Sequence, residues 1–232
     1  MLKAILFDKD GTLIDFQKSW GPAMAHVIAD YARGDGRLAF ALAGDVVFDA
    51  ATRTFPPTSP FVAGTTMDFA PAWARRLGFD DAVTLRAEID AALGRAVLKT
   101  ITPIADAPNV LRTLRARGYR LGIATNDADQ PARDQAAALG VADVLDFIAG
   151  YDSGFGAKPA PGMVLAFAAA VGVAPGEVAL VGDSRHDLET ARAAGAVAIA
   201  VLSGPAPREA LAPLADHVFA DVAALPDFLA AP

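Results

Sequence analysis

The sequence of 232 residues contains no cysteine, which excludes disulfides, thiolate catalysis and metal sites built on cysteine ligands. It has only three histidines, His26, His186 and His217, so we do not expect a histidine-rich metal site. Basic residues are also few: 20 lysines and arginines stand against 27 acidic residues, a net charge of −7. Because nucleic-acid affinity comes from neutralising phosphates, an acidic chain without a basic stripe is a poor candidate for that role.

Long apolar runs are missing as well. The most apolar window, residues 163–182, is interrupted by two glycines, a proline and a glutamate, and does not resemble a segment that crosses a bilayer. Four charged residues among the first ten break the apolar stretch that a signal peptide requires. We therefore expect a cytoplasmic protein with no membrane partner.

What the sequence does contain is a regular alternation of short apolar runs and helical patterns. Apolar residues make up 53% of the chain, which is enough for a buried core. This alternation is typical of an α/β fold, here a Rossmann-like parallel sheet covered by helices on both faces. The expected strands are 4–7, 120–124, 147–149, 178–181, 196–201 and 217–219, and the expected helices between them are 110–117, 131–139, 162–171 and 188–194.

One long segment departs from this alternation, because residues 15–100 show helical patterns and no convincing strand. The expected elements there are helices at 17–33, 37–53, 67–77 and 81–99, and an irregular segment with prolines and threonines at 55–66. The prediction is an α/β core domain, residues 1–14 and 101–232, interrupted by a helical domain, residues 15–100.

Two carboxylates follow the first predicted strand. Asp8 and Asp10 precede Gly11 and Thr12 at the point where the strand at 4–7 ends. Open α/β sheets bind ligands at the carboxyl ends of their strands, so the pair could bind a hard cation or divide nucleophilic and acid–base roles. A polar turn that leaves a buried strand explains the same residues equally well.

A second pair of aspartates has the same relation to a strand. Asp183 follows the strand at 178–181, and Asp187 comes four residues later, near the first turn of the next helix. Taken alone, these aspartates are explained as a helix N-cap and a partner of the helix dipole.

Two further groups could bind phosphate. Thr125 and Asn126 follow the strand at 120–124, where a hydroxyl and turn N–H groups can hold phosphate oxygens. Lys158, one of only five lysines, lies between a glycine-rich segment and a proline-bounded helix start, and would supply a compact positive charge. A helix cap and a solvated side chain are the ordinary explanations of such residues taken singly.

The order of the four motifs resembles that of the haloacid dehalogenase superfamily of phosphohydrolases. The motifs are Asp-x-Asp-Gly-Thr, a threonine after the second core strand, a lysine, and Gly-Asp-x-x-x-Asp, and they span residues 7–187. The helical insert resembles a C1 cap, and the chain looks closest to the phosphoglycolate phosphatase-like branch. The resemblance implies a Mg²⁺-dependent phosphatase that hydrolyses a small phosphorylated metabolite through an aspartyl-phosphate.

The resemblance also implies a role for each aspartate of the first and last motifs. Asp8 would be the nucleophile, and Asp10 would protonate the leaving alcohol and then activate water. Mg²⁺ would be held by the Asp8 carboxylate, the Asp10 backbone carbonyl and the Asp183 carboxylate.

The remaining motif residues are implied to serve the phosphate. Thr125, with the backbone N–H of Asn126, would hold phosphoryl oxygens. Lys158 would neutralise charge on the phosphate and the nucleophile. Asp187 would orient Lys158 or a metal-bound water rather than bind the metal directly.

Two neighbouring residues receive no catalytic role. Lys9 is expected to point to the opposite face of the strand end, and it is interpreted as structural or electrostatic background. His186 is interpreted as a loop residue rather than a ligand.

Alternatives within and outside the superfamily remain. The presence of Asp10 argues against the halide-releasing members, and no lysine lies between Lys18 and Lys99 to serve as the amine of the phosphonate-cleaving members. A sugar phosphomutase keeps both aspartates and the same type of cap. A non-catalytic binding protein on the same fold is the alternative from another class.

Substrate choice is implied to come largely from the cap, which would close over the core site. We expect a monomer or a homodimer whose partner is a small phosphorylated metabolite. A plain connector between helices explains the irregular segment equally well. The candidate contact residues in and around that segment are Arg53, Thr54, Thr58, Ser59, Thr65, Thr66 and Arg75.

Overall fold

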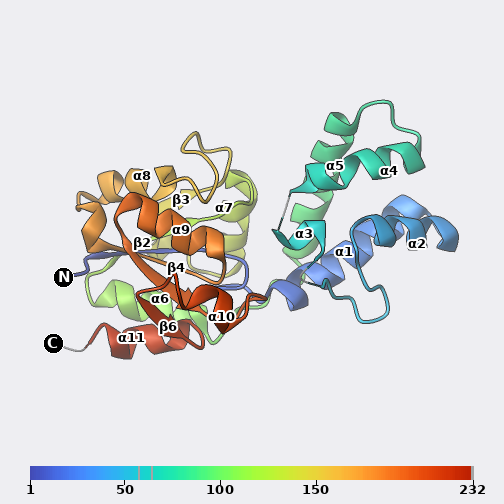
Figure 1. Ribbon diagram of the computed structural model, residues 1–232. Coiled ribbons are helices and arrows are strands. Elements are labelled where there is room, and N and C mark those ends of the chain that lie inside the picture. Colours follow the sequence, from blue (N-terminus) through green and yellow to red (C-terminus); the bar gives the residue numbers. More distant parts are fainter. Residues whose placement is uncertain (57, 64, 231–232) are drawn as a thin grey trace. The chain divides into compact units, whose positions relative to one another are not determined.

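The structure is a computed structural model that describes residues 1–56, 58–63 and 65–230 (Figure 1). The chain divides into two compact units. The core unit comprises Met1–Asp15 and Thr102–Pro232, and the helical unit comprises Phe16–Ile101. Within the described residues, no helix combines the length and the apolar content needed to span a membrane.

The core unit contains a parallel sheet of six strands in the order β3-β2-β1-β4-β5-β6, which confirms the predicted α/β fold. The first strand lies in the middle, and its last residue, Phe7, is in register with Ile123 on one side and Val181 on the other. The strands are β1 (Ala4–Phe7), β2 (Arg120–Ala124), β3 (Phe147–Ala149), β4 (Val178–Gly182), β5 (Val197–Val201) and β6 (His217–Phe219).

Helices cover both faces of this sheet (Figure 1). One face packs against Met163 and Phe167 of α8 and Leu188 of α9, and it uses Leu6 and Leu180 of the central strands. Successive side chains of a strand point to opposite faces, so Ile5 and its equivalents face the other helix layer. The helices of this unit are α6 (Ala107–Ala116), α7 (Asp129–Ala138), α8 (Gly162–Val171), α9 (Arg185–Ala194), α10 (Arg208–Leu211) and α11 (Leu225–Phe228), with 3₁₀ turns η2 (Ala142–Val144), η3 (Pro175–Glu177) and η4 (Val222–Ala224).

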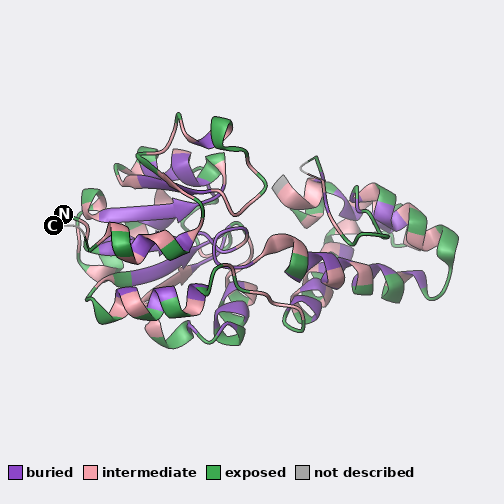
Figure 2. Cartoon of the chain, turned by 90° about the horizontal axis from the view of Figure 1, so that it is seen from below, coloured by how far each residue is buried: buried purple, intermediate pink, exposed green. Residues whose placement is uncertain are grey.

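The central strands are sealed from solvent. All residues of β1 and β4 are buried, and strands of the core unit appear as purple arrows in Figure 2. Strands covered on both faces are uniformly apolar rather than alternating. The strand pattern of the sequence therefore predicts this layer well, and polar residues begin only where the strands end.

The helical unit has its own core, built around Met24, Leu42, Trp73, Leu85 and Ile89. It contains no strand among the described residues. Its elements are α1 (Phe16–Ala32), α2 (Gly36–Asp45), α3 (Pro60–Ala63), the 3₁₀ turn η1 (Thr66–Asp68), α4 (Ala70–Leu77) and α5 (Ala82–Val97). Pro57, in the predicted irregular segment, lies outside the described residues.

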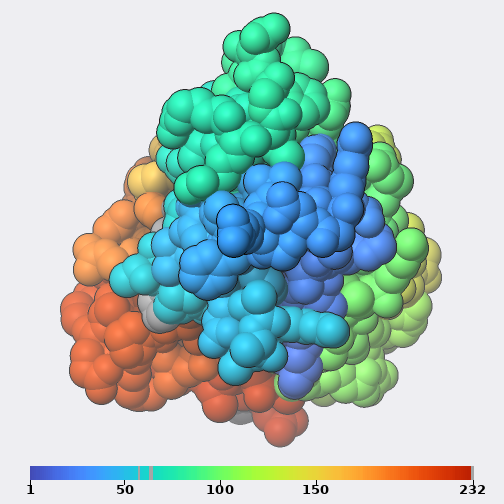
Figure 3. Space-filling view, turned by 90° about the vertical axis from the view of Figure 1, so that its right-hand side faces the viewer, coloured from blue at the N-terminus to red at the C-terminus, as the bar shows by residue number. Residues whose placement is uncertain are grey.

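The prediction of one helix over 37–53 is wrong, because α2 ends at Asp45. Val47 adopts a left-handed backbone conformation, with a φ of 51°, which a helix cannot continue. The Asp49 carboxylate then accepts hydrogen bonds from the backbone N–H groups of Ala51 and Thr52, forming a turn. In the space-filling view this segment, coloured cyan, lies next to α2 (Figure 3).

Other helix boundaries differ by a turn. The predicted helix at 67–77 is split, since the 3₁₀ turn η1 precedes α4, and Pro71 lies in the first turn of α4. Helix α9 begins at Arg185 rather than at residue 188, because Ser184 caps it. His186 consequently lies in the first turn of α9 and is exposed, so its interpretation as a loop residue is wrong.

Candidate active site

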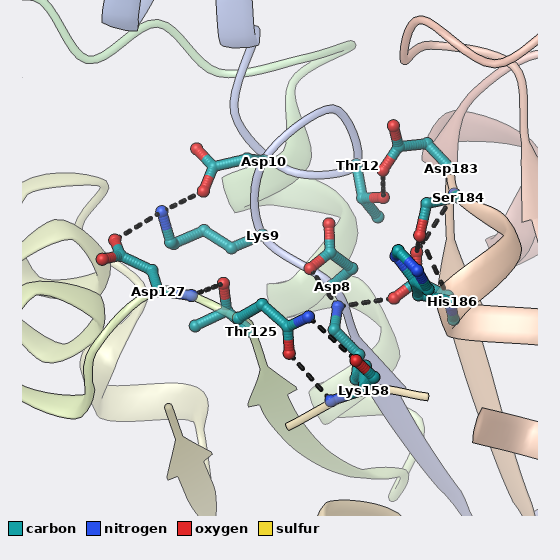
Figure 4. A network of polar contacts seen from close by, with 12 residues as sticks. Asp8, Lys9, Asp10, Thr12, Thr125, Asp127, Lys158, Asp183, Ser184 and His186 are labelled. Carbon is teal, nitrogen blue, oxygen red and sulfur yellow. Dashed lines mark hydrogen bonds and ion pairs between the residues drawn. The ribbon is translucent and has the colours of Figure 1, made fainter. Parts of the chain in front are cut away.

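The candidate site lies in the core unit, where the central strands end. Asp8 follows β1, Thr125 follows β2 and Asp183 follows β4. In an open α/β sheet the ends of neighbouring parallel strands form a crevice where the strand order reverses, and here that point is β1. The fold thus brings side chains that are more than one hundred residues apart into one place (Figure 4).

The centre of the site is a buried ammonium between two carboxylates. Lys158 Nζ donates to Asp8 Oδ1 at 2.6 Å and to Asp187 Oδ1 at 2.5 Å. All three residues are buried. Burial opposes the charge of Lys158, but Asp187 and Asp8 outweigh that effect and raise the pKa of its amine. Lys158 therefore carries its charge at neutral pH.

Burial also dominates the chemistry of the two strand-end carboxylates. It raises the pKa of Asp8 to about 6, although the neighbouring Lys158 acts in the opposite direction. Burial and the charge of Asp8 raise the pKa of Asp183 well above its ordinary value. The ionised carboxylates of Asp8 and Asp183 repel each other, and a cation bound between them would relieve that repulsion.

The donor set fits such a cation. Oxygen atoms of Asp8, Asp183 and Asp187 all lie within 4.8 Å of one another. Carboxylate oxygens are the ligands that Mg²⁺ prefers in proteins. Asp187 already accepts hydrogen bonds from Lys158 and from the N–H and hydroxyl groups of Ser184. Asp8 and Asp183 are therefore the carboxylates best suited to hold the cation.

Asp187 is fixed by the start of α9. Ser184 is the N-cap of that helix, and its hydroxyl donates to Asp187 Oδ2 at 2.6 Å. Ser184 Oγ also accepts from the backbone N–H of Asp187 at 3.3 Å, and the Asp187 carboxylate accepts from the backbone N–H of Ser184, so the two residues form a capping box. Asp187 is therefore both a capping residue of α9 and a partner of Lys158.

The predicted phosphate-binding residues lie together at the end of β2. Thr125 is buried, and its Oγ1 accepts from the backbone N–H of Asp127 at 3.1 Å. The Asn126 side chain has a function that sequence reasoning missed. Its Oδ1 accepts from the backbone N–H of Lys158 at 2.8 Å, and its Nδ2 donates to the Lys158 carbonyl at 3.1 Å. These two hydrogen bonds hold the backbone at Lys158 against the end of β2.

The loop after β5 is a second feature that sequence reasoning missed. Ser203 Oγ donates to the backbone carbonyl of Gly11 at 2.7 Å. A Cβ on Gly204 would lie 1.7 Å from Asp183 Oδ2, so only glycine leaves room for that carboxylate. Thr12 Oγ1 donates to the other oxygen of Asp183 at 3.3 Å. The sequence feature that could have revealed this loop is its Ser-Gly pair, which comes two residues after the end of β5.

The Lys9 side chain points away from this centre (Figure 4). Lys9 extends toward Asp10 and Asp127 on the side of the strand end opposite Lys158, as expected from its place in the motif (Figure 4). It is fully buried, and it donates to the Asp10 carboxylate and to Gln135 Oε1. The interpretation of Lys9 as structural or electrostatic background is therefore incomplete, because its buried ammonium has several ionic and polar partners.

The predicted cap contacts belong to the helical unit, and some of them serve its own fold. Ser59 is buried, and its hydroxyl donates to the Val46 carbonyl at 2.6 Å. Thr65 pairs with Asp68 at the start of η1. The candidates with exposed side chains are Arg53, Thr58, Thr65 and Arg75, while Thr54 and Thr66 are half-buried.

Comparison with known proteins places the chain in a family. Residues 2–195 match the profile of the haloacid dehalogenase-like hydrolases. The chain is 32% identical to a phosphoglycolate phosphatase from Rhodospirillum rubrum, over all of this chain and 92% of that protein.

Solved structures agree on the fold. A predicted phosphoglycolate phosphatase from Haemophilus somnus superposes with a TM-score of 0.70 at 18% identity, covering 98% of each chain. A predicted β-phosphoglucomutase from Thermotoga maritima superposes with a TM-score of 0.72 at 18% identity, covering 99% of each chain. At these identities the likeness establishes the fold alone. The profile match and the full-length relative confirm the resemblance drawn from the motifs: the chain is an enzyme of the haloacid dehalogenase-like hydrolase family.

Proposed function

We propose that this enzyme is a Mg²⁺-dependent phosphatase that hydrolyses a phosphomonoester of a small metabolite. The observation that carries the proposal is the buried Lys158 ammonium held between Asp8 and Asp187, with the Asp183 carboxylate beside them. A fixed cation beside a carboxylate at a strand end suits the approach of an anionic phosphoryl group to an anionic nucleophile.

In the proposed first step, an Asp8 carboxylate oxygen attacks phosphorus. The new O–P bond forms as the bond from phosphorus to the alcohol oxygen breaks, and Asp10 gives its proton to that oxygen. Water then attacks the phosphorus of the aspartyl-phosphate, the bond between phosphorus and the Asp8 oxygen breaks, and Asp10 takes up one proton of the water. Inorganic phosphate leaves, and both aspartates return to their starting states.

The other residues bind and orient the phosphoryl group. Lys158 balances its charge, while Thr125 and the backbone N–H of Asn126 donate to its oxygens. Asp187 keeps the Lys158 ammonium in place through its bond at 2.5 Å. Mg²⁺ would be held by the carboxylates of Asp8 and Asp183 and the backbone carbonyl of Asp10, and it would offset the negative charge of the phosphoryl oxygens.

The proposed substrate class is an alkyl phosphate, with 2-phosphoglycolate as the first compound to test. The support is the 32% identical relative, a phosphoglycolate phosphatase that aligns with all of this chain over 92% of its own length. We further propose that the helical unit is the cap that sets substrate choice. A cytoplasmic location, and a monomer or homodimer without nucleic-acid or membrane partners, complete the proposal.

Phosphate release tests the proposal directly. The purified enzyme is offered a panel of phosphorylated acids and sugars, with Mg²⁺ or with a chelator, alongside Asp8→Asn. We expect release only with Mg²⁺, and a loss of about 10³-fold or more in Asp8→Asn with an unchanged melting temperature. Full activity in that variant would show that Asp8 is not the nucleophile.

The same assay separates hydrolysis from phosphoryl transfer to a sugar. A hexose monophosphate is supplied with and without its bisphosphate, and the isomeric product is measured beside free phosphate. The proposal expects phosphate as the product in both cases. A bisphosphate-primed isomerisation faster than phosphate release would replace the phosphatase by a mutase.

A further inference from the structure

Lys9 is a buried charge that the proposed mechanism does not use. It stands between the two aspartates at the end of β1, and none of its surface is exposed. A buried ammonium is costly unless partners compensate for its lost hydration. Its Nζ donates to the Asp10 carboxylate, donates to Gln135 Oε1 at 2.6 Å and lies 3.2 Å from Asp127 Oδ2.

These partners come from three separate parts of the core unit. Asp10 belongs to the turn after β1, Asp127 to the loop after β2, and Gln135 to α7. Gln135 is itself fully buried, and its Nε2 donates to Asp127 Oδ2 at 3.2 Å. We call Lys9, Asp10, Asp127 and Gln135 the Lys9 cluster.

The Lys9 cluster also reaches the loop after β2 that carries Thr125. The backbone N–H of Asp127 donates to Thr125 Oγ1 at 3.1 Å, and Thr125 is the proposed phosphate-binding residue. One ammonium therefore connects the turn that carries Asp10 with the loop that carries Thr125 (Figure 4). A purely structural ion network could serve the fold by joining two loops. Here, however, one partner is the side chain to which proton transfer is assigned.

We propose that Lys9 is a positioning residue that fixes the carboxylate of Asp10 for proton transfer, with Asp127 and Gln135 holding Lys9 in place. The inference rests on the proposed function, because that function supplies the acid–base role of Asp10. A carboxylate on a rotatable side chain must be held in a narrow range of positions to transfer a proton efficiently. A buried ammonium with three partners is well suited to that purpose.

The chemistry of the leaving group provides a specific readout. When phosphorus passes from the substrate oxygen to Asp8, an alkoxide needs a proton from Asp10, whereas 4-nitrophenolate leaves without one. Misplacing Asp10 should therefore slow the transfer from alkyl phosphates and affect aryl phosphates little. The parameter to compare is kcat/KM, because it reports the first phosphoryl transfer and not the later hydrolysis.

The test variant is Lys9→Met, which keeps the length of the side chain and removes its charge. For the best alkyl phosphate of the panel we expect kcat/KM to fall about 10-fold to 100-fold, and for 4-nitrophenyl phosphate by less than about threefold. A merely structural role would lower both values together or leave both unchanged. An unchanged ratio of the two values in the folded variant would overturn the proposal.

The absence of cysteine from the chain allows a rescue experiment. Lys9→Cys would carry a single thiol, which 2-bromoethylamine converts in denaturant into an amine of nearly the same length as lysine. After refolding, we expect the ratio of the two kcat/KM values to return toward that of the wild type. Alkylation with iodoacetamide gives a neutral side chain and should not restore it. An aminoethylated protein with the wild-type melting temperature and an unrestored ratio would refute the positioning role.

Two further variants complete the design. Asp10→Asn should itself show the loss that is selective for alkyl phosphates. If it does not, the acid–base role fails with the proposed function, and if it does while Lys9→Met does not, only the present inference fails. Should Lys9→Met not fold, Asp127→Asn removes a charged partner of Lys9 from a half-exposed position. It should shift the same ratio by about threefold, and no shift would count against the proposal.

Discussion

The Lys158 ammonium lies between two buried carboxylates, so removing it affects both of them. In Lys158→Met the Asp8 carboxyl loses the neighbour that lowers its pKa, while burial and Asp187 continue to raise it. Ionised Asp8 then requires a higher pH. We expect the acid limb of the pH–rate profile to move upward and kcat/KM to fall about 10²-fold or more.

The same variant should lose stability, by about 3 kcal/mol in the free energy of unfolding, because it leaves buried carboxylates without their partner. Lys3→Met is the matched control, since Lys3 pairs with Glu177 through a largely exposed side chain. That control should change neither the pH–rate profile nor the melting curve measurably. A Lys158→Met enzyme with the wild-type acid limb would contradict the assignment of Lys158 as the partner of Asp8.

Gly204 gives a prediction about the metal rather than the nucleophile. In Gly204→Ala the new Cβ would meet Asp183 Oδ2 at 1.7 Å, so the carboxylate must turn away. We expect the Mg²⁺ concentration for half-maximal activity to rise about 10-fold. Gly176→Ala, whose Cβ would have its nearest neighbour at 3.7 Å, should leave the Mg²⁺ dependence unchanged. Equal Mg²⁺ dependence of the two variants would remove Gly204 from the metal site.

Which site residues the sequence could predict depends on whether their partners are local. Asp8, Asp183 and Lys158 were recognisable because each follows a strand or a distinctive turn in the right order. The pairing of Asn126 with the backbone of Lys158 joins residues 32 positions apart, and that of Ser203 with Gly11 joins residues 192 positions apart. No periodicity or composition reports such contacts, because they exist only when the sheet has formed.

Helix α9 links local capping to the site. In Ser184→Ala the helix loses its N-cap and Asp187 loses a hydrogen bond of 2.6 Å. We expect the free energy of unfolding to fall by about 1 kcal/mol. Because Asp187 then holds Lys158 less firmly, we also expect kcat/KM to fall about tenfold.

Asp81, the N-cap of α5 in the helical unit, provides the control for that prediction. Asp81→Ala removes a comparable cap and should cost about 1 kcal/mol of stability, with kcat/KM unchanged. Chemical denaturation and steady-state kinetics on both variants make the comparison. Similar kinetic losses in the two would mean that activity follows overall stability and not the position of Asp187.

The bounds of helices and strands could be predicted where the pattern of apolar residues alone determines them. Strands β1, β2 and β3 have the bounds that the apolar runs predict, and β1, which is buried throughout, contains no polar residue. The helix expected at 37–53 failed because Val47 and Asp49 end it through backbone conformation and a local turn. The spacing of apolar residues alone reports neither a left-handed backbone conformation nor a turn formed by a side chain.

At the scale of the whole molecule, the raised pKa of Asp8 predicts how pH and Mg²⁺ together affect the free energy of unfolding. The pKa of Asp8 rises from 3.8 to about 6 on folding, so this carboxyl binds more protons in the metal-free folded protein than in the unfolded chain between these values. The contribution of Asp8 to the free energy of unfolding should therefore decrease as the pH rises through that window. Mg²⁺ should compensate above pH 6, where the Asp8 carboxylate is ionised.

Thermal unfolding at two pH values tests this prediction. With Mg²⁺ in place of chelator, we expect the melting temperature to rise by about 4 °C or more at pH 7.5 and by much less at pH 5, where protons compete with the metal. Asp8→Asn removes the titrating group and should reduce the difference between the two pH values. A gain from Mg²⁺ of equal size at both pH values would contradict the coupling.

The position of β1 in the sheet has a consequence for how the protein is made. Ala4 pairs with Arg120 and Val178, so β1 is synthesised long before either strand that flanks it. The helical unit, Phe16–Ile101, is complete in sequence before β2 leaves the ribosome, and its contacts are closer in the chain than the pairings of β1 with β2 and β4. The helices are therefore expected to fold first. Strand β1, which Asp8 follows, therefore remains an unpaired apolar segment until β2 and β4 have been synthesised.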